Sequence, residues 1–102
     1  MDIEEIRDGL RSGQLRLRVH ADERVNRRHI TRDEIREAIL RDEIIEEYPI
    51  HHYGPCCLIY GTAISGRPLH VLVALPPDPW VITVYEPDPA RWVDFRIRRR
   101  NR

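Results

Sequence analysis

The sequence predicts an α+β fold in which two to three N-terminal helices pack on one face of a four- to five-stranded antiparallel sheet. Apolar residues recur at helical spacing in the first part of the chain, and short β-rich runs separated by turn residues follow. The links between these runs are too short to hold crossover helices, which favours antiparallel neighbours. The 102 residues suit a single domain, 1–102.

The first helix is expected to begin near Ile3. Ile3, Ile6 and Leu10 fall on one helical face, and acidic residues occupy the first turn. Gly9 and Gly13 are expected to limit this helix.

A second helix is expected over residues 19–29. His20, Arg24, Arg27 and Arg28 share one of its faces, at positions i, i+4, i+7 and i+8. This basic face is either a functional surface or a solvated face whose arginines pair with nearby acidic residues.

The third helix has the clearest local signal. Thr31 and Glu34 have the spacing of a capping box, and Ile30 and Ile35 have the spacing of a hydrophobic staple. The helix is expected to end near Arg41. Its predicted buried stripe is Ile35, Ala38 and Ile39.

Short β runs fill the second half of the chain, and Gly, Pro, Ser and Asp separate them. In the last run, Val93, Phe95 and Ile97 alternate with polar residues, which places Arg96 and Arg98 on an arginine face. The expected strands are 44–48, 56–63, 69–75, 80–86 and 93–98.

The charge of the chain balances overall but not locally. It has 17 acidic and 17 basic residues, and every basic residue is arginine. Residues 16–41 hold eight arginines against five acids, and residues 91–102 hold six against one. Zero net charge argues against a uniformly basic nucleic-acid module, but a polarised surface results if the two blocks meet. Arginine without lysine is typical of a GC-rich genome and also suits bidentate phosphate contacts.

Several protein classes are excluded. The N-terminus is acidic and amphipathic rather than a signal peptide, and the longest apolar run, 71–75, is far too short for a membrane helix. Cys56 and Cys57 are neighbours and cannot form an ordinary structural disulfide. A cytoplasmic protein without membrane contact is therefore expected.

A metal site is the weakest of the chemical hypotheses. Its candidate ligands do not have the paired spacing of zinc sites, and adjacent strand residues point to opposite faces. We therefore expect neither metal nor cofactor. The candidate ligands are His51, His52, Cys56, Cys57 and His70.

RNA cleavage without metal is the favoured chemistry. It needs a base, an acid and cations on the phosphate, and histidine and arginine suit these roles. The alternative is that each histidine is a structural residue and that the tyrosine packs in the sheet. The predicted catalytic residues are His20, Arg24, His70 and Tyr85, and the predicted RNA-phosphate ligands are Arg27, Arg28, Arg96 and Arg98.

Three stretches resemble motifs of the domain-of-unknown-function family numbered 4258. They are HADERVNRRHIT at 20–31, GRPLHVLV at 66–73 and WVITVYEP at 80–87. The resemblance covers about residues 17–90 and leaves a basic C-terminal strand and tail, 91–102, outside it.

The resemblance implies a relative of RelE- and MqsR-like toxins, which are small mRNA endoribonucleases with helices on an antiparallel sheet. It also implies a cognate antitoxin, in this family often a zinc-finger protein of the MqsA/YgiT type. The motif positions that carry over are His20, Arg24, Arg28, His70 and Tyr85. Several such toxins rely on lysine, which this chain lacks.

The predicted function is therefore a toxin-type, metal-independent endoribonuclease that acts on mRNA and is neutralised by an antitoxin. The alternative is a non-catalytic module with the same fold that binds RNA or protein. A homodimer is left open.

Overall fold

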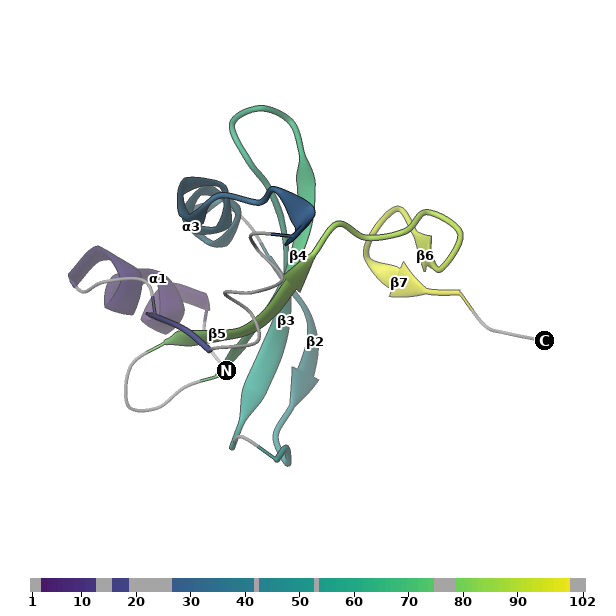
Figure 1. Ribbon diagram of the computed structural model, residues 1–102. Coiled ribbons are helices and arrows are strands. Elements are labelled where there is room, and N and C mark those ends of the chain that lie inside the picture. The colour runs from purple at the N-terminus through teal and green to yellow at the C-terminus, as the bar shows by residue number, and fades with distance from the viewer. Residues whose placement is uncertain are drawn as a thin grey trace.

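The computed structural model describes residues 3–12, 16–18, 27–41, 43–52, 54–74 and 79–99. This part of the chain holds two helices, a five-stranded sheet and a separate two-stranded sheet (Figure 1). In chain order the elements are α1 (Ile3–Ser12), β1 (Arg16–Leu17), α3 (Arg32–Leu40), β2 (Glu43–Tyr48), β3 (Cys56–Thr62), β4 (Pro68–Ala74), β5 (Trp80–Tyr85), β6 (Trp92–Val93) and β7 (Ile97–Arg98).

The five-stranded sheet is mixed, which corrects the expected antiparallel sheet. Its order is β1-β5-β4-β3-β2, and β2 to β5 form antiparallel pairs with their neighbours, as the short links predict. The exception is β1, whose Arg16 and Leu17 pair in parallel with Trp80 and Val81 of β5. A parallel pair needs a long connection between its strands. Here α3 and three strands provide it, and the two residues of β1 carry no strand pattern.

The two described helices lie on one face of the sheet (Figure 1). They bury the predicted apolar positions against β3, β4 and β5, and most of these side chains are no more than 3% exposed. The expected second helix falls mostly on residues 19–26, which lie outside the described residues. The buried cluster comprises Ile6, Leu10, Ile30, Ile35, Ala38, Ile39, Cys57, Ile59, Leu69, Val71, Val73, Val81 and Val84.

The start of α3 agrees with the sequence prediction. Thr31 Oγ1 accepts a hydrogen bond from Glu34 N at 3.0 Å, and Glu34 Oε1 accepts one from Thr31 N at 2.9 Å. These two bonds satisfy backbone groups that the helix itself leaves unpaired. Ile30 and Ile35 of the predicted staple are both buried in the core.

Gly9 does not limit α1, which continues to Ser12. A Cβ at Gly9 would lie 2.5 Å from the ring carbons of Pro79. Gly9 is therefore needed because the chain that enters β5 approaches the helix closely, a role that only the tertiary structure reveals.

Residues 92–98 form a hairpin, hereafter the C-terminal hairpin, rather than the single strand predicted over 93–98. Arg96 N donates to Val93 O at 3.0 Å, and Asp94 and Phe95 between them have φ values of 53° and 58°. Two positive φ angles are the signature of a type I′ turn, which normally uses Asn or Gly. The sequence lacks that turn signal, so its alternating pattern suggested a strand.

The C-terminal hairpin lies beyond the sheet on the side away from the helices (Figure 1). Successive residues of β4 alternate between the two faces. Leu69, Val71 and Val73 enter the helix-facing core, and His70 therefore faces the opposite way. The fold thus covers one sheet face with helices and part of the other with the hairpin.

Candidate functional site

A cleft of about 960 Å³ opens between residues 28–30, the end of β5 and the C-terminal hairpin. We call it the arginine cleft. Arg28 comes from the first basic block of the sequence, and Arg91, Arg98 and Arg99 come from the second, so the fold brings both blocks to one surface. The lining residues are Arg28, Ile30, Arg67, Tyr85, Glu86, Asp88, Arg91, Trp92, Arg98 and Arg99.

The cleft is positively charged, because five arginines and only two carboxylates line it. One carboxylate, Glu86, is occupied by Arg67, with 3.1 Å between Glu86 Oε1 and Arg67 Nε. The other, Asp88, accepts from the backbone of Ala90 through Oδ1 at 2.9 Å. Asp88 keeps its charge, but the arginines outnumber the two acids, so the lining of the cleft is cationic.

Three of the cleft arginines form no ion pair with any described carboxylate: Arg28, Arg91 and Arg99. Arg28 Nη1 donates to Val84 O at 2.7 Å, and Arg99 Nε donates to Pro89 O at 3.0 Å. These bonds fix two guanidinium groups and leave their charge unneutralised by the described acids. Such groups are suited to bind a phosphate.

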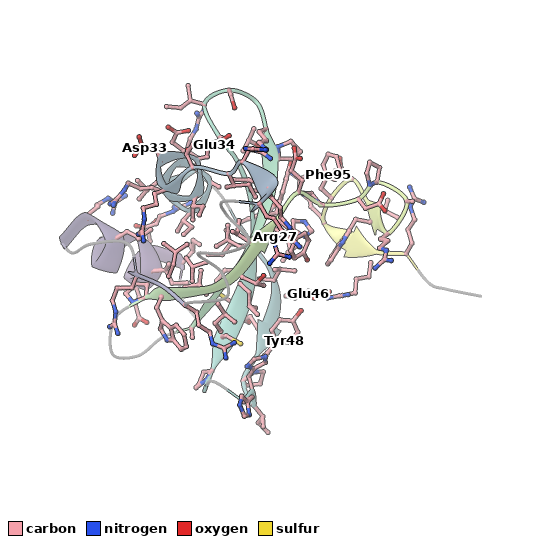
Figure 2. All side chains as sticks on the ribbon, viewed as in Figure 1. Arg27, Asp33, Glu34, Glu46, Tyr48 and Phe95 are labelled. Carbon is pink, nitrogen blue, oxygen red and sulfur yellow. The ribbon has the colours of Figure 1, made fainter. Side chains whose placement is uncertain are left out.

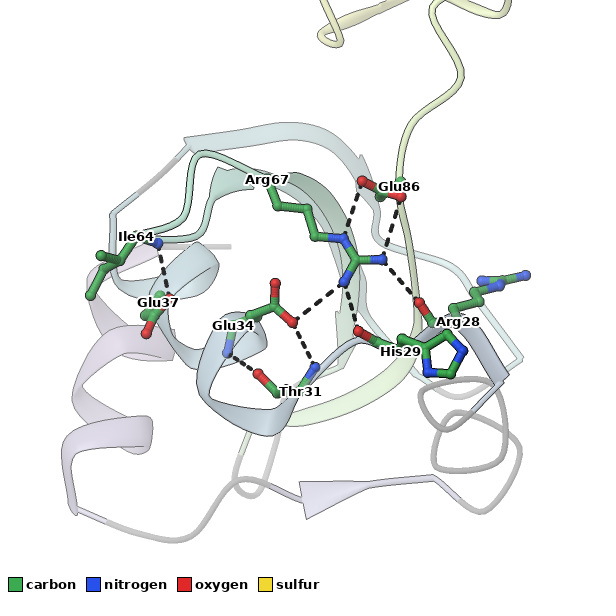
Figure 3. A network of polar contacts seen from close by, with 8 residues as sticks. All are labelled: Arg28, His29, Thr31, Glu34, Glu37, Ile64, Arg67 and Glu86. Atoms are coloured by element: carbon green, nitrogen blue, oxygen red, sulfur yellow. Dashed lines mark hydrogen bonds and ion pairs between the residues drawn. The ribbon is translucent and has the colours of Figure 1, made fainter.

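Arg67 holds the chain that carries Arg28 (Figure 3). Its Nη2 donates to Arg28 O at 3.0 Å, and its Nη1 donates to His29 O at 2.8 Å. Its ion pairs join Glu86 to Glu34 of the capping box. The hydrogen bond that Arg67 donates to Glu86 raises the pKa of Arg67 further, so this residue stays charged. Arg67 is thus a structural connection and not a free phosphate ligand.

His70 and Tyr85 are brought together, as paired residues of β4 and β5. His70 Nδ1 lies 3.2 Å from Tyr85 Oη, and His70 Nε2 lies 2.6 Å from Phe95 O in the C-terminal hairpin. A carbonyl oxygen only accepts, so Nε2 carries the proton and donates to it. In the neutral imidazole Nδ1 is then the acceptor, and Tyr85 donates its hydroxyl proton to it.

His70 is completely buried, with 0% of its surface exposed. The Trp92 ring packs edge-on against it with centroids 4.4 Å apart, and Tyr60 and Tyr85 also contact its ring edge-on. Burial lowers the pKa of His70 and therefore favours the neutral ring. Burial likewise raises the pKa of Tyr85, which keeps the phenol protonated. His70 does not line the cleft, and its hydrogen-bonded link to the cleft runs through Tyr85.

The C-terminal hairpin is attached to the sheet by acidic side chains of β2 (Figure 2). Arg98 Nε lies 2.9 Å from Glu46 Oε2, and Arg96 pairs with Glu43. The Arg98 guanidinium also lies over the Trp92 ring, 4.7 Å from its centroid. The acidic strand therefore holds the basic hairpin over His70.

The predicted site residues do not all meet. Tyr85, Arg28 and Arg98 line the arginine cleft, and His70 lies directly behind Tyr85. Arg27 is exposed but is not among the cleft residues, and Arg96 pairs with Glu43 outside the cleft. His20 and Arg24 lie outside the described residues.

Sequence reasoning missed Arg91 and Arg99 as individual cleft residues. The only signal was the net charge of the block 91–102, which points to a basic segment but not to particular side chains. Their position depends on the turn at 88–91, in which Arg91 N and Trp92 N both donate to Asp88 O.

The cysteine and histidine candidates do not assemble into a metal site. Among the described residues no group of three or more His, Cys, Asp or Glu side chains is placed to hold a metal ion. Cys56 and Cys57 are buried free thiols, and burial raises the pKa of Cys57 to about 12, so it is a poor thiolate ligand.

None of the described helices is long and apolar enough to cross a membrane.

Comparison with known proteins gives one match. No curated protein and no solved structure matches the chain significantly. The similarity to RelE- and MqsR-like toxins therefore stays a prediction. A family model described as "Domain of unknown function (DUF4258)" matches residues 17–86, which include β4, β5 and the His70–Tyr85 pair but exclude the C-terminal hairpin. Because this match covers most of the chain, the protein belongs to that family.

Proposed function

We propose that the arginine cleft binds the phosphate backbone of single-stranded RNA. The observation that carries the proposal is the convergence of Arg28, Arg91 and Arg99, which come from two basic blocks and have no ion pair with a described acid. Guanidinium groups bind phosphate oxygens through paired hydrogen bonds. A half-buried tyrosine at the base of the same cleft adds a polar aromatic contact of the kind used for unpaired nucleotides.

The test is the double variant Arg91→Ala/Arg99→Ala, measured by fluorescence anisotropy with a labelled single-stranded RNA oligonucleotide over a range of KCl concentrations. The wild type should bind less tightly as salt rises. Loss of two phosphate contacts should reduce the slope of log affinity against log salt by about 1.4, because each contact to a single strand accounts for about 0.7.

Arg11→Ala/Arg32→Ala is the matched control, since it also removes two exposed arginines, which lie on α1 and α3 outside the cleft. It should leave the slope unchanged. The proposal is wrong if the cleft variant and the control bind RNA with the same affinity and salt dependence.

RNA cleavage is a second candidate, favoured by the hydrogen-bonded chain from Tyr85 through His70 to Phe95 O. In this reaction the ribose 2′-oxygen bonds to the adjacent phosphorus as the bond from phosphorus to the 5′-oxygen breaks. The 2′-hydroxyl proton passes to Tyr85 Oη while the Tyr85 proton passes to His70 Nδ1. The 5′-oxygen takes a proton from His20, which the sequence predicts to share the base and acid roles with His70.

Cleavage is tested by incubating the purified protein with single-stranded RNA in EDTA. We expect products ending in a 2′,3′-cyclic phosphate, and we expect Tyr85→Phe to bind RNA without cutting it. Wild-type protein that binds RNA and leaves it intact would exclude cleavage and leave the non-catalytic binding module.

A further inference from the structure

Tyr85 presents only hydrogen-bond acceptors to the arginine cleft. The Phe95 carbonyl fixes the proton of His70 on Nε2, and the free Nδ1 then takes the hydroxyl proton of Tyr85. The phenolic hydrogen is thus turned inward, towards a fully buried ring. What Tyr85 Oη still offers a ligand is its lone pairs.

A phosphate oxygen is a poor partner for this oxygen. Phosphate groups accept hydrogen bonds, and two acceptors facing each other repel. The neighbouring guanidinium groups of Arg28, Arg91 and Arg99 can bind the phosphate instead. The natural partner for Tyr85 is a neutral donor held beside a phosphate, and in a nucleic acid the ribose 2′-hydroxyl is such a donor.

We propose that Tyr85, oriented by His70 and Phe95 O, accepts a hydrogen bond from a ribose 2′-hydroxyl and so makes the arginine cleft prefer RNA to DNA of the same sequence. This inference rests on the proposed binding of single-stranded nucleic acid. The arginines bind the phosphates of RNA and DNA alike, and Tyr85 distinguishes ribose from deoxyribose. His70 is a positioning residue that acts through Tyr85 and does not touch the nucleic acid.

The buried surroundings of His70 support a stable orientation. Its ring is enclosed by Trp92, Tyr60 and Tyr85, so no solvent competes for either ring nitrogen. Burial also lowers the pKa of His70, which preserves the neutral ring near neutral pH. A charged ring would donate from both nitrogens and would turn the Tyr85 hydroxyl outward as a donor.

The first test uses the wild-type protein with three single strands of one sequence: RNA, DNA and 2′-O-methyl RNA. We expect the protein to bind RNA about five- to tenfold more tightly than DNA, which is the usual effect of one hydrogen bond. The 2′-O-methyl strand should bind like DNA, because it keeps the 2′-oxygen but lacks the donor proton. Equal binding of all three strands would overturn this inference while leaving RNA binding intact, and no binding of any strand would overturn both proposals.

The second test uses variants in the same assay. Tyr85→Phe should lose the preference for RNA and keep its affinity for DNA. Tyr60→Phe is the matched control, because Tyr60 also contacts His70 but does not line the cleft. Tyr60→Phe should still bind RNA more tightly than DNA.

His70 is tested by a rescue. His70→Asn can place an amide oxygen near the position of Nδ1 and should retain part of the RNA preference, whereas His70→Leu should lose it. A merely structural role for His70 would change the affinity for RNA and DNA equally. If both Tyr85→Phe and His70→Leu still bind RNA more tightly than DNA, the roles proposed for Tyr85 and His70 are wrong.

Discussion

His70 shows how far a single residue can be interpreted from sequence. A histidine flanked by apolar strand residues was open to a catalytic and to a structural interpretation. The structure places it at 0% exposure with both ring nitrogens hydrogen-bonded. Its acceptor, Phe95 O, lies in a hairpin 25 residues away in sequence, so no local pattern could reveal it. The sequence singled out both His70 and Tyr85, but only the pairing of β4 with β5 makes them neighbours.

The buried neutral state of His70 predicts a pH-dependent stability. Because burial lowers its pKa in the folded protein, the unfolded chain takes up a proton at a higher pH than the folded one does. The contribution of His70 to stability is therefore complete above about pH 6.5 and declines as the pH falls below it, by at most about 1.4 kcal/mol per pH unit.

Urea denaturation of the wild type and of His70→Asn from about pH 7.5 down to about pH 5.5 measures this effect, since few carboxylates titrate in that range. The wild type should lose stability more steeply than the variant, whose residue 70 does not titrate. Parallel pH profiles for the two proteins would show that His70 is not responsible.

Whole elements were predicted well where their signal is local. The capping box of α3 and the turn residues around β2, β3, β4 and β5 lie next to the elements that they delimit. The predicted strand over 93–98 was wrong because its turn depends on distant contacts. Phe95 is a bulky residue at positive φ, which costs about 1–2 kcal/mol. Its carbonyl bond to His70 and its ring contact with Tyr60 offset that cost.

The capping box of α3 predicts a measurable contribution to stability. Thr31→Ala removes the acceptor for Glu34 N and should lower the free energy of unfolding by about 1 kcal/mol. Ser65→Ala, in the exposed turn between β3 and β4, is the control and should change stability little. Urea denaturation compares the two variants. A loss no larger for Thr31→Ala than for Ser65→Ala would mean that the cap does not stabilise the helix.

At the scale of the whole molecule, zero net charge proved to be a poor guide to the surface. Glu43 and Glu46 of β2 pair with Arg96 and Arg98 of the C-terminal hairpin. Arg28, Arg91 and Arg99, which form no ion pair with a described acid, lie together in the cleft. The sequence contained both basic blocks, but the distance between them was set by the fold.

The sequence by itself determined the α+β class, the α3 boundary and four of the strands, because hydrophobic periodicity, capping and turn residues act over a few neighbouring residues. Only the tertiary structure decided that β1 joins the sheet in parallel, that the C-terminal hairpin covers His70 and that the arginine cleft exists. Each of these depends on contacts between residues far apart in the chain. Such contacts form because the packed state satisfies buried hydrogen bonds and charges, and no local pattern records them.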